Sequence, residues 1–118
     1  MSATRFAILG SGHIGQRHAL HAAQYGQLVA VCDLDQAKAK SLADTYNAKA
    51  LPNLESLLSI APDLDLVAIC TPNGLHAEHA IACMQAGLNV LVEKPMAIAL
   101  VECERMMEVA KQTGTTIF

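Results

Sequence analysis

The feature that most constrains the fold of this chain is a glycine-rich turn, Gly10-Ser11-Gly12-His13-Ile14-Gly15. The apolar run Phe6-Ala7-Ile8-Leu9 precedes the turn and predicts a buried strand, and residues 13–24 follow it with a helical pattern. Glycines also mark ordinary turns, so the spacing by itself is weak evidence. A strand before the turn and a helix after it are the context in which this spacing binds the pyrophosphate of a dinucleotide.

Each glycine has a separate task in that interpretation. Gly10 allows the tight turn, Gly12 lets the backbone approach the pyrophosphate, and Gly15 lets the helix pack closely on the strand. The phosphates would lie at the positive N-terminus of the helix, where the backbone N–H of His13 matters more than its ring. We therefore expect Gly10, Gly12, His13, Ile14 and Gly15 to contact the cofactor.

An acid follows the second apolar run at the place where a dinucleotide site needs one. Residues 28–32 end at Asp33, where the carboxylate would accept hydrogen bonds from the adenosine ribose hydroxyls. The alternatives are a surface aspartate after an ordinary turn, or a domain for another phosphorylated ligand such as a mononucleotide. Asp33 argues against the second of these, because its position suits a ribose diol.

The charges around this acid favour NAD over NADP. A carboxylate at Asp33 would repel the 2′-phosphate of NADP, and the neighbouring Leu34, which we also expect to contact the cofactor, offers no cation. Lys38 and Lys40 lie on the next predicted helix and could reach a phosphate only if the loop tilts. We predict NAD as the cofactor, with NADP as the less favoured alternative.

Short apolar runs alternate with helical segments along the whole chain, and this pattern is typical of βαβ units. We predict the α/β class: a doubly wound, mostly parallel sheet with helices on both faces, in a single domain over residues 1–118. The expected strands are residues 6–9, 28–32, 48–51, 66–70, 89–92 and 115–118, and the expected helices are residues 13–24, 36–46, 54–58, 75–86 and 100–112. Asp35 and Asn53 are candidate N-caps, Gly87 and Gly114 are helix stops, and Val101, Met106, Val109 and Ala110 are expected on one face of the last helix.

Composition excludes several classes of partner. The net charge is −3 and lysines and arginines form no cluster, which argues against a nucleic acid or an anionic membrane as the main partner. The apolar runs are much shorter than a membrane span, and residues 1–5 lead directly into a strand, so we expect a cytoplasmic protein. The four cysteines form no C-x-x-C pair, and we expect all four to fill the core as reduced thiols.

Five histidines raise the question of a metal site. His18 and His21 are three positions apart on one predicted helix, and His76 and His79 repeat that spacing on another. Two ligands on one turn are too few for zinc, and no cysteine or carboxylate completes either pair. We therefore predict no metal and expect helix-surface histidines, with His76 as the exception.

Taken in order, the glycine turn, Asp33, Thr71-Pro72-Asn73 with His76, and Glu93-Lys94-Pro95 resemble the Gfo/Idh/MocA family of oxidoreductases. The resemblance covers the whole chain but only the first, nucleotide-binding domain of that family. It implies that Thr71, Pro72 and Asn73 line the dinucleotide and that His76 supports their loop beside the cleft. It also implies that Glu93 and Lys94 lie near the nicotinamide ribose and the reacting carbon; either isomer of the Lys94–Pro95 bond fits the sequence.

Within the family, the lysine of the E-K-P tripeptide is the catalytic residue, which the resemblance assigns to Lys94. A cation there would stabilise the charge that develops as the substrate hydroxyl loses its proton. The resemblance implies an NAD(P)-dependent dehydrogenase acting on a secondary alcohol of a sugar, nucleotide sugar or cyclitol. The family's substrate-binding α+β domain, which usually carries the oligomer interface, is absent from these 118 residues, so we expect NAD binding without turnover. The alternative is a stand-alone NAD-binding or sensing module.

Overall fold

The sheet of this protein places the ends of its strands on two opposite edges of the molecule. The computed structural model describes residues 3–93 and 96–118. Five parallel strands lie in the order β3-β2-β1-β4-β5. They are β1 (Arg5–Leu9), β2 (Gln27–Cys32), β3 (Lys49–Leu51), β4 (Leu66–Ile69) and β5 (Asn89–Val92). The strand order reverses between β1 and β4, and this confirms the predicted doubly wound sheet.

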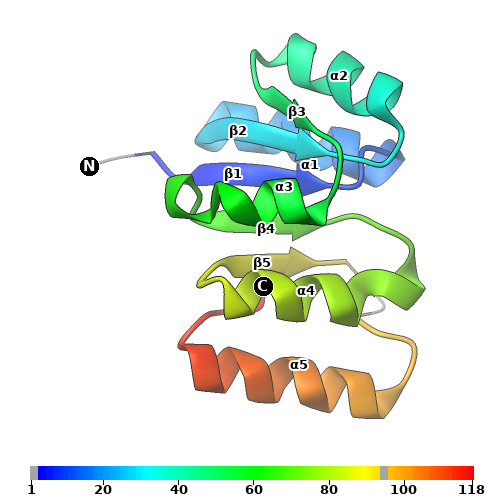
Figure 1. Cartoon of the computed structure of the whole chain (residues 1–118), viewed down its shortest axis with the longest axis vertical. Coiled ribbons are helices and arrows are strands. Elements are labelled where there is room, and N and C mark those ends of the chain that lie inside the picture. Colours follow the sequence, from blue (N-terminus) through cyan, green and yellow to red (C-terminus); the bar gives the residue numbers. More distant parts are fainter. Residues whose placement is uncertain (1–2, 94–95) are drawn as a thin grey trace.

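Helices cover both faces of the sheet (Figure 1). Helices α1 (His13–Tyr25) and α2 (Gln36–Thr45) pack on one face, and α3 (Leu54–Ser59), α4 (His76–Gln85) and α5 (Leu100–Thr113) pack on the other. Successive residues of β1 serve the two faces in turn, since Ile8 joins the first core and Ala7 and Leu9 join the second. Both faces being buried explains why the strands are apolar throughout.

The predicted helix ends are close to the observed ones. The side chain of Asp35 accepts a hydrogen bond from the Lys38 N–H, and that of Asn53 accepts one from the Ser56 N–H, so both caps are confirmed. Helix α3 ends at Ser59, and a short 3₁₀ turn over Ala61–Asp63 leads into β4. A second 3₁₀ turn, Asn73–Leu75, precedes α4, which therefore begins one residue later than the pattern predicts.

Two predictions about the last part of the chain were wrong. Val101 is 70% exposed, whereas Met106 and Val109 are buried. Five residues turn an α-helix by about 140° beyond a full turn, so Val101 and Met106 cannot share a narrow face. The predicted final strand is only a single parallel bridge between Ile117 and Val90, supported by backbone hydrogen bonds beside β5.

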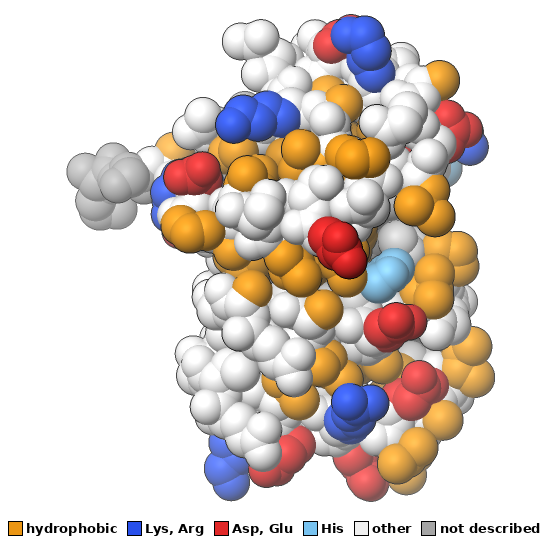
Figure 2. All heavy atoms as spheres, viewed as in Figure 1, with side chains coloured by type: hydrophobic (Ala, Val, Ile, Leu, Met, Phe, Trp, Pro, Cys, Tyr) orange, Lys and Arg blue, Asp and Glu red, His pale blue; other side chains and the backbone are white. Residues whose placement is uncertain are grey.

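Charged side chains are spread over the surface. On the face shown in Figure 2, basic and acidic side chains are interspersed among apolar ones, without a basic stripe among the residues described. Over the same described residues, no helix combines the length and the apolar character that crossing a bilayer requires.

Candidate functional site

A cleft of about 620 Å³ opens at the carboxyl ends of β1, β2 and β4. This is the edge at which the strand order reverses, where open α/β sheets bind their ligands. Six of the predicted cofactor residues line the cleft: Gly10, Gly12, Asp33, Leu34, Thr71 and Pro72. They come from three different loops, which only the folded sheet brings together.

The glycine turn is required by the fold at two of its three glycines. Gly10 has φ +97°, and a Cβ there would lie 2.7 Å from the carbonyl oxygen of Cys70. At Gly15 a Cβ would lie 2.1 Å from the carbonyl oxygen of Gly10, so the close contact of helix and turn depends on glycine, as predicted. A Cβ at Gly12 would meet nothing within 4 Å. The space beside Gly12 is therefore open to the cleft.

The N-terminus of α1 faces this open space with its backbone. Within the described part of the chain, the helix has no side-chain cap and no acidic residue in its first turn. The first backbone N–H groups of a helix have no partner within the helix, and the macrodipole is positive there. His13 lines a groove that continues from the cleft and includes Gln16 and Lys38. The arrangement is suited to an anion.

Asp33 is held by the glycine turn itself. Its Oδ2 accepts hydrogen bonds from the backbone N–H of Ser11 at 2.8 Å and from the Ser11 hydroxyl at 2.7 Å, and its Oδ1 accepts one from the Asp35 N–H at 2.8 Å. Burial alone would raise the pKa of Asp33, but these hydrogen bonds and the charge of Lys38 outweigh it and lower the pKa. Asp33 is therefore a carboxylate, fixed beside the cleft. Sequence reasoning missed Ser11, a small polar residue between two glycines.

Lys38 lies nearer to the cleft than the sequence suggested. It lines both the cleft and the adjoining groove, while Lys40 pairs with Asp44 at 3.1 Å on the exposed side of α2. Helix α2 begins only three residues after Asp33, so its first turn reaches the cleft without any tilt of the loop. Asn53, Leu54 and Leu75 also line the cleft and were not predicted.

Two histidines of α4 hold the loop that carries Thr71. His76 is 1% exposed, and its Nε2 lies 2.8 Å from the backbone oxygen of Thr71, which is the loop support expected of it. Nδ1 of His79 lies 2.9 Å from the Thr71 hydroxyl. His79 is half-buried and lines the cleft, so its assignment to the helix surface was wrong. Asn73, in the 3₁₀ turn just after this pair of contacts, is exposed and lies outside the cleft lining.

The assignment of His18 to the helix surface was also wrong. Its Nε2 lies 2.5 Å from Oε1 of Glu93, the residue that follows β5. These two residues line a small separate pocket together with Ile14, Arg17 and His21. His21, one turn along α1, is exposed and stacks on Tyr25, as a surface histidine would. Lys94 and Pro95 lie outside the described residues, and within the described ones no group of three potential ligands could hold a metal ion.

The cysteines are all free thiols that pack against the two cores. Burial raises the pKa of Cys32 to about 11 and of Cys70 and Cys83 to about 12. Cys70 lines the cleft, but at neutral pH it is a neutral thiol and not a nucleophile. The predicted role of the cysteines as core residues is confirmed for Cys32 and Cys83, whereas Cys70 and Cys103 are half-buried and pack against the cores.

Comparison with known proteins identifies the family of this chain. Residues 4–118 match the family model for the oxidoreductase family of Gfo/Idh/MocA type, NAD-binding Rossmann fold. The chain is 34% identical to D-glucoside 3-dehydrogenase of Escherichia coli over 98% of its own length and 34% of that protein. It is 33% identical to inositol 2-dehydrogenase 3 of Saccharopolyspora erythraea over 93% of the chain and 33% of that protein.

A solved structure agrees with these sequence matches. The WlbA dehydrogenase of Chromobacterium violaceum, in complex with NADH and UDP-GlcNAcA, superposes with a TM-score of 0.94 at 32% identity. The match covers 100% of this chain and 35% of that one. The chain thus spans about a third of the length of the relatives it matches.

Proposed function

Because this chain belongs to the Gfo/Idh/MocA oxidoreductase family and forms its NAD-binding Rossmann fold, we propose that its cleft holds NAD for a dehydrogenase of a sugar, nucleotide sugar or cyclitol. The relatives named above carry such substrates in their names. When bound, NAD would accept or return a hydride at its nicotinamide ring. The residues of this chain bind and orient that group.

The single observation that carries the proposal is the open space at Gly12. The chain's own packing demands glycine at positions 10 and 15, but nothing in the described structure approaches a Cβ at position 12. The absence of a side chain there leaves room for a ligand against the backbone at the N-terminus of α1. A pyrophosphate fits this place, since it needs N–H donors, positive potential and no bulk.

Asp33 defines the adenosine end of the proposed site. It lies across the cleft from Thr71 and Pro72, and as a carboxylate it would accept hydrogen bonds from a ribose diol. A 2′-phosphate would meet the same negative charge, which supports NAD over NADP. Lys38 at the cleft offsets part of that repulsion, so NADP stays the second candidate.

We place the reaction itself at Lys94, by resemblance to the family. Its role would be to stabilise the developing alkoxide and to take the proton of the substrate hydroxyl. In the whole enzyme, Lys94→Ala should abolish turnover and leave NAD affinity within about twofold, since a residue acting only in the transition state contributes little to ground-state binding. Steady-state kinetics with cofactor titration measure both, and surviving turnover would remove Lys94 from the mechanism.

These 118 residues alone would bind NAD without turnover, because enclosing a sugar against the nicotinamide requires walls that this cleft does not supply. A sensing module would share the binding and need no Lys94. Oligomer formation and a cytoplasmic location stay predictions of the sequence.

The first experiment is isothermal titration of the chain with NAD and, separately, with NADP. We expect saturable NAD binding and at least tenfold weaker NADP binding, a difference of about 1.4 kcal/mol. Equal affinity for both would remove the discriminating role of Asp33, and binding of neither would overturn the proposed function of the chain.

A further inference from the structure

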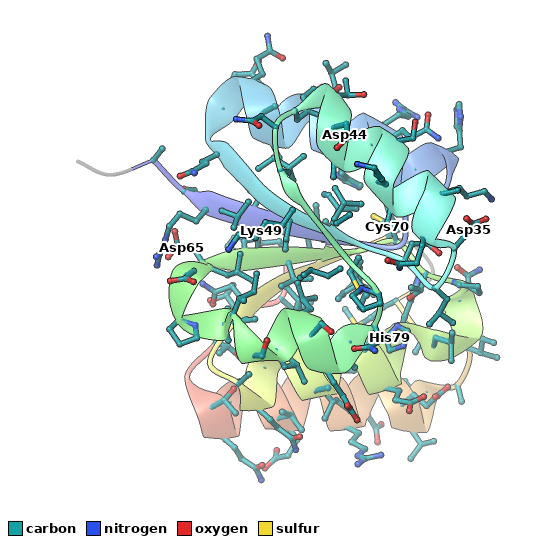
Figure 3. The ribbon with its side chains drawn as sticks, turned by 45° about the horizontal axis from the view of Figure 1, so that its top comes forward. Asp35, Asp44, Lys49, Asp65, Cys70 and His79 are labelled. Carbon is teal, nitrogen blue, oxygen red and sulfur yellow. The ribbon has the colours of Figure 1, made fainter. Side chains whose placement is uncertain are left out.

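His79 lines the cleft but has no role in the binding of the pyrophosphate or the ribose proposed above. It is half-buried on α4 and lines the cleft, and Figure 3 places it with Cys70 at the carboxyl edge of the sheet, away from Asp65 at the other edge. Its Nδ1 lies 2.9 Å from the Thr71 hydroxyl, and burial lowers its pKa. A neutral imidazole with one nitrogen already engaged has its second nitrogen left for another partner.

The groups around His79 agree with a neutral ring. Cys70, at the end of β4, is a protonated thiol at neutral pH, and Asp33 and Lys38 line the cleft with opposite charges. On its own helix, the charge of Glu78 raises the pKa of His79 and that of His76 lowers it, and both effects are smaller than that of burial. Burial therefore decides the protonation state.

The surroundings also indicate which part of the ligand this ring meets. The cleft beside Asp33 is lined by the apolar side chains of Leu34, Leu54 and Leu75. If Asp33 binds the adenosine ribose, the base attached to that ribose enters this apolar part of the cleft, where His79 supplies a polar atom. A purine presents unprotonated ring nitrogens as hydrogen-bond acceptors at its edge.

We propose that His79 is a specificity-determining residue of the cleft: Thr71 donates to Nδ1 and thereby fixes the tautomer that presents Nε2–H to a ring nitrogen of the adenine. This inference rests on the proposed function and adds to it the recognition of the base. Two histidines on one turn of α4 thus contact different parts of Thr71. Nε2 of His76 lies against the Thr71 backbone oxygen, and Nδ1 of His79 lies against the Thr71 hydroxyl.

The proposal has a pH signature. A base bound over His79 would bury the ring further, and burial disfavours the charged imidazolium, so the complex selects the neutral ring. Affinity for the cofactor is then constant above pH 6.5 and falls once the pH drops below the lowered pKa of the free protein, by up to tenfold per pH unit. Binding buries His79 further and lowers its pKa again, which deepens the loss.

Two substitutions of His79 distinguish the roles of its two ring nitrogens. In His79→Gln the side-chain amide reaches the position of Nε2 and donates at every pH, while in His79→Asn it reaches only the position of Nδ1. The chain and both variants are titrated calorimetrically with NAD and with ADP-ribose from pH 5 to 8. His21→Gln is the matched control, because His21 is exposed on α1, stacks on Tyr25 and is not among the residues that line the cleft.

We expect His79→Asn to weaken both ligands about fivefold to tenfold at pH 8, and His79→Gln to keep most of the affinity and lose the fall below pH 6.5. Thr71→Val should weaken the binding of both ligands, and its thermal midpoint should stay within a few degrees of that of the unmodified chain. If the chain binds NAD but both His79 variants match the unmodified chain in affinity and pH profile, the role of His79 is wrong and the proposed function survives. If the unmodified chain does not bind NAD, the proposed function itself has failed.

Discussion

Asp33 shows how a single carboxylate serves the fold and the site together. Its two oxygens accept three hydrogen bonds from Ser11 and Asp35, which tie the end of β2 to the glycine turn after β1. An ionised carboxylate has about four acceptor positions, so capacity is left for a ribose hydroxyl. The residue that would recognise the ligand is therefore already oriented without it.

We predict that Asp33→Ala weakens NAD binding about tenfold or more, because a hydrogen bond to a charged group contributes about 1.5–3 kcal/mol. The variant should also narrow the gap between NAD and NADP, since the repulsion of the 2′-phosphate is removed. Calorimetric titration measures both affinities. Asp44→Ala is the control, because Asp44 pairs only with Lys40 on the surface of α2 among the described contacts; unchanged NAD affinity in Asp33→Ala would contradict the assignment.

At the scale of the element, the turn between β1 and α1 separates two uses of glycine. Gly15 is glycine because the carbonyl of Gly10 leaves no room for a Cβ, whereas Gly12 has open space beside it. The packing of the chain therefore explains why position 15 is glycine, but it does not explain why position 12 is glycine. A matched pair of substitutions tests this division.

We expect Gly15→Ala to reduce the free energy of unfolding by about 3 kcal/mol or more, because the added methyl collides with backbone that cannot move independently. Gly12→Ala should change stability by less than about 1 kcal/mol but weaken NAD binding at least tenfold, because the methyl would stand where the pyrophosphate lies. Urea unfolding and calorimetric titration measure the two effects. Full NAD affinity in a folded Gly12→Ala variant would rule out the phosphate site.

At the scale of the whole molecule, the two edges of the sheet are built differently. At the amino edge, where Figure 3 labels Asp65, this residue and Arg5 join the starts of β1 and β4 through an ion pair at 3.1 Å and through hydrogen bonds that involve the backbone. At the carboxyl edge the same two strands diverge into the glycine turn and the Thr71 loop, and the cleft lies between them. The amino edge is closed by the contact between Arg5 and Asp65, and the carboxyl edge is open to a ligand.

The closed edge predicts a pH dependence of stability. Hydrogen bonds from the Arg5 side chain and backbone lower the pKa of Asp65 below 3.8, so the native state binds fewer protons there than the unfolded chain. The stabilisation is complete above pH 3.8 and is lost as the pH falls through the lowered pKa. Asp65→Asn should therefore lower the thermal midpoint at pH 6 and show a shallower decrease between pH 5 and 2.

Thermal unfolding followed by circular dichroism over that range measures the effect. Arg5→Gln is the partner variant: it should reproduce the shallower decrease, and combining the two substitutions should add little, because both remove one interaction. Parallel pH profiles for the unmodified chain and Asp65→Asn would show that this ion pair does not contribute to acid unfolding.

Much of the fold followed from local pattern. The strands that were expected at residues 6–9, 28–32 and 89–92, and the caps at Asp35 and Asn53, needed only apolar runs and short polar side chains at their boundaries. The prediction of a final strand failed because a neighbour decides the outcome: only Ile117 forms a bridge, to Val90 of β5. The prediction for Val101 failed for a local reason, since the helical spacing between Val101 and Met106 already places them on different faces.

The sequence by itself determined the family of the chain, its doubly wound sheet, and the glycine turn with Asp33, because those signals are local spacings that report backbone requirements. Only the tertiary structure decided what those residues touch. Ser11 under Asp33, His18 against Glu93, and His79 beneath Thr71 are contacts between segments far apart along the chain or between a helix and a loop. The spacing of residues along the sequence does not predict such contacts, because the distance between two side chains depends on how the helices pack on the sheet.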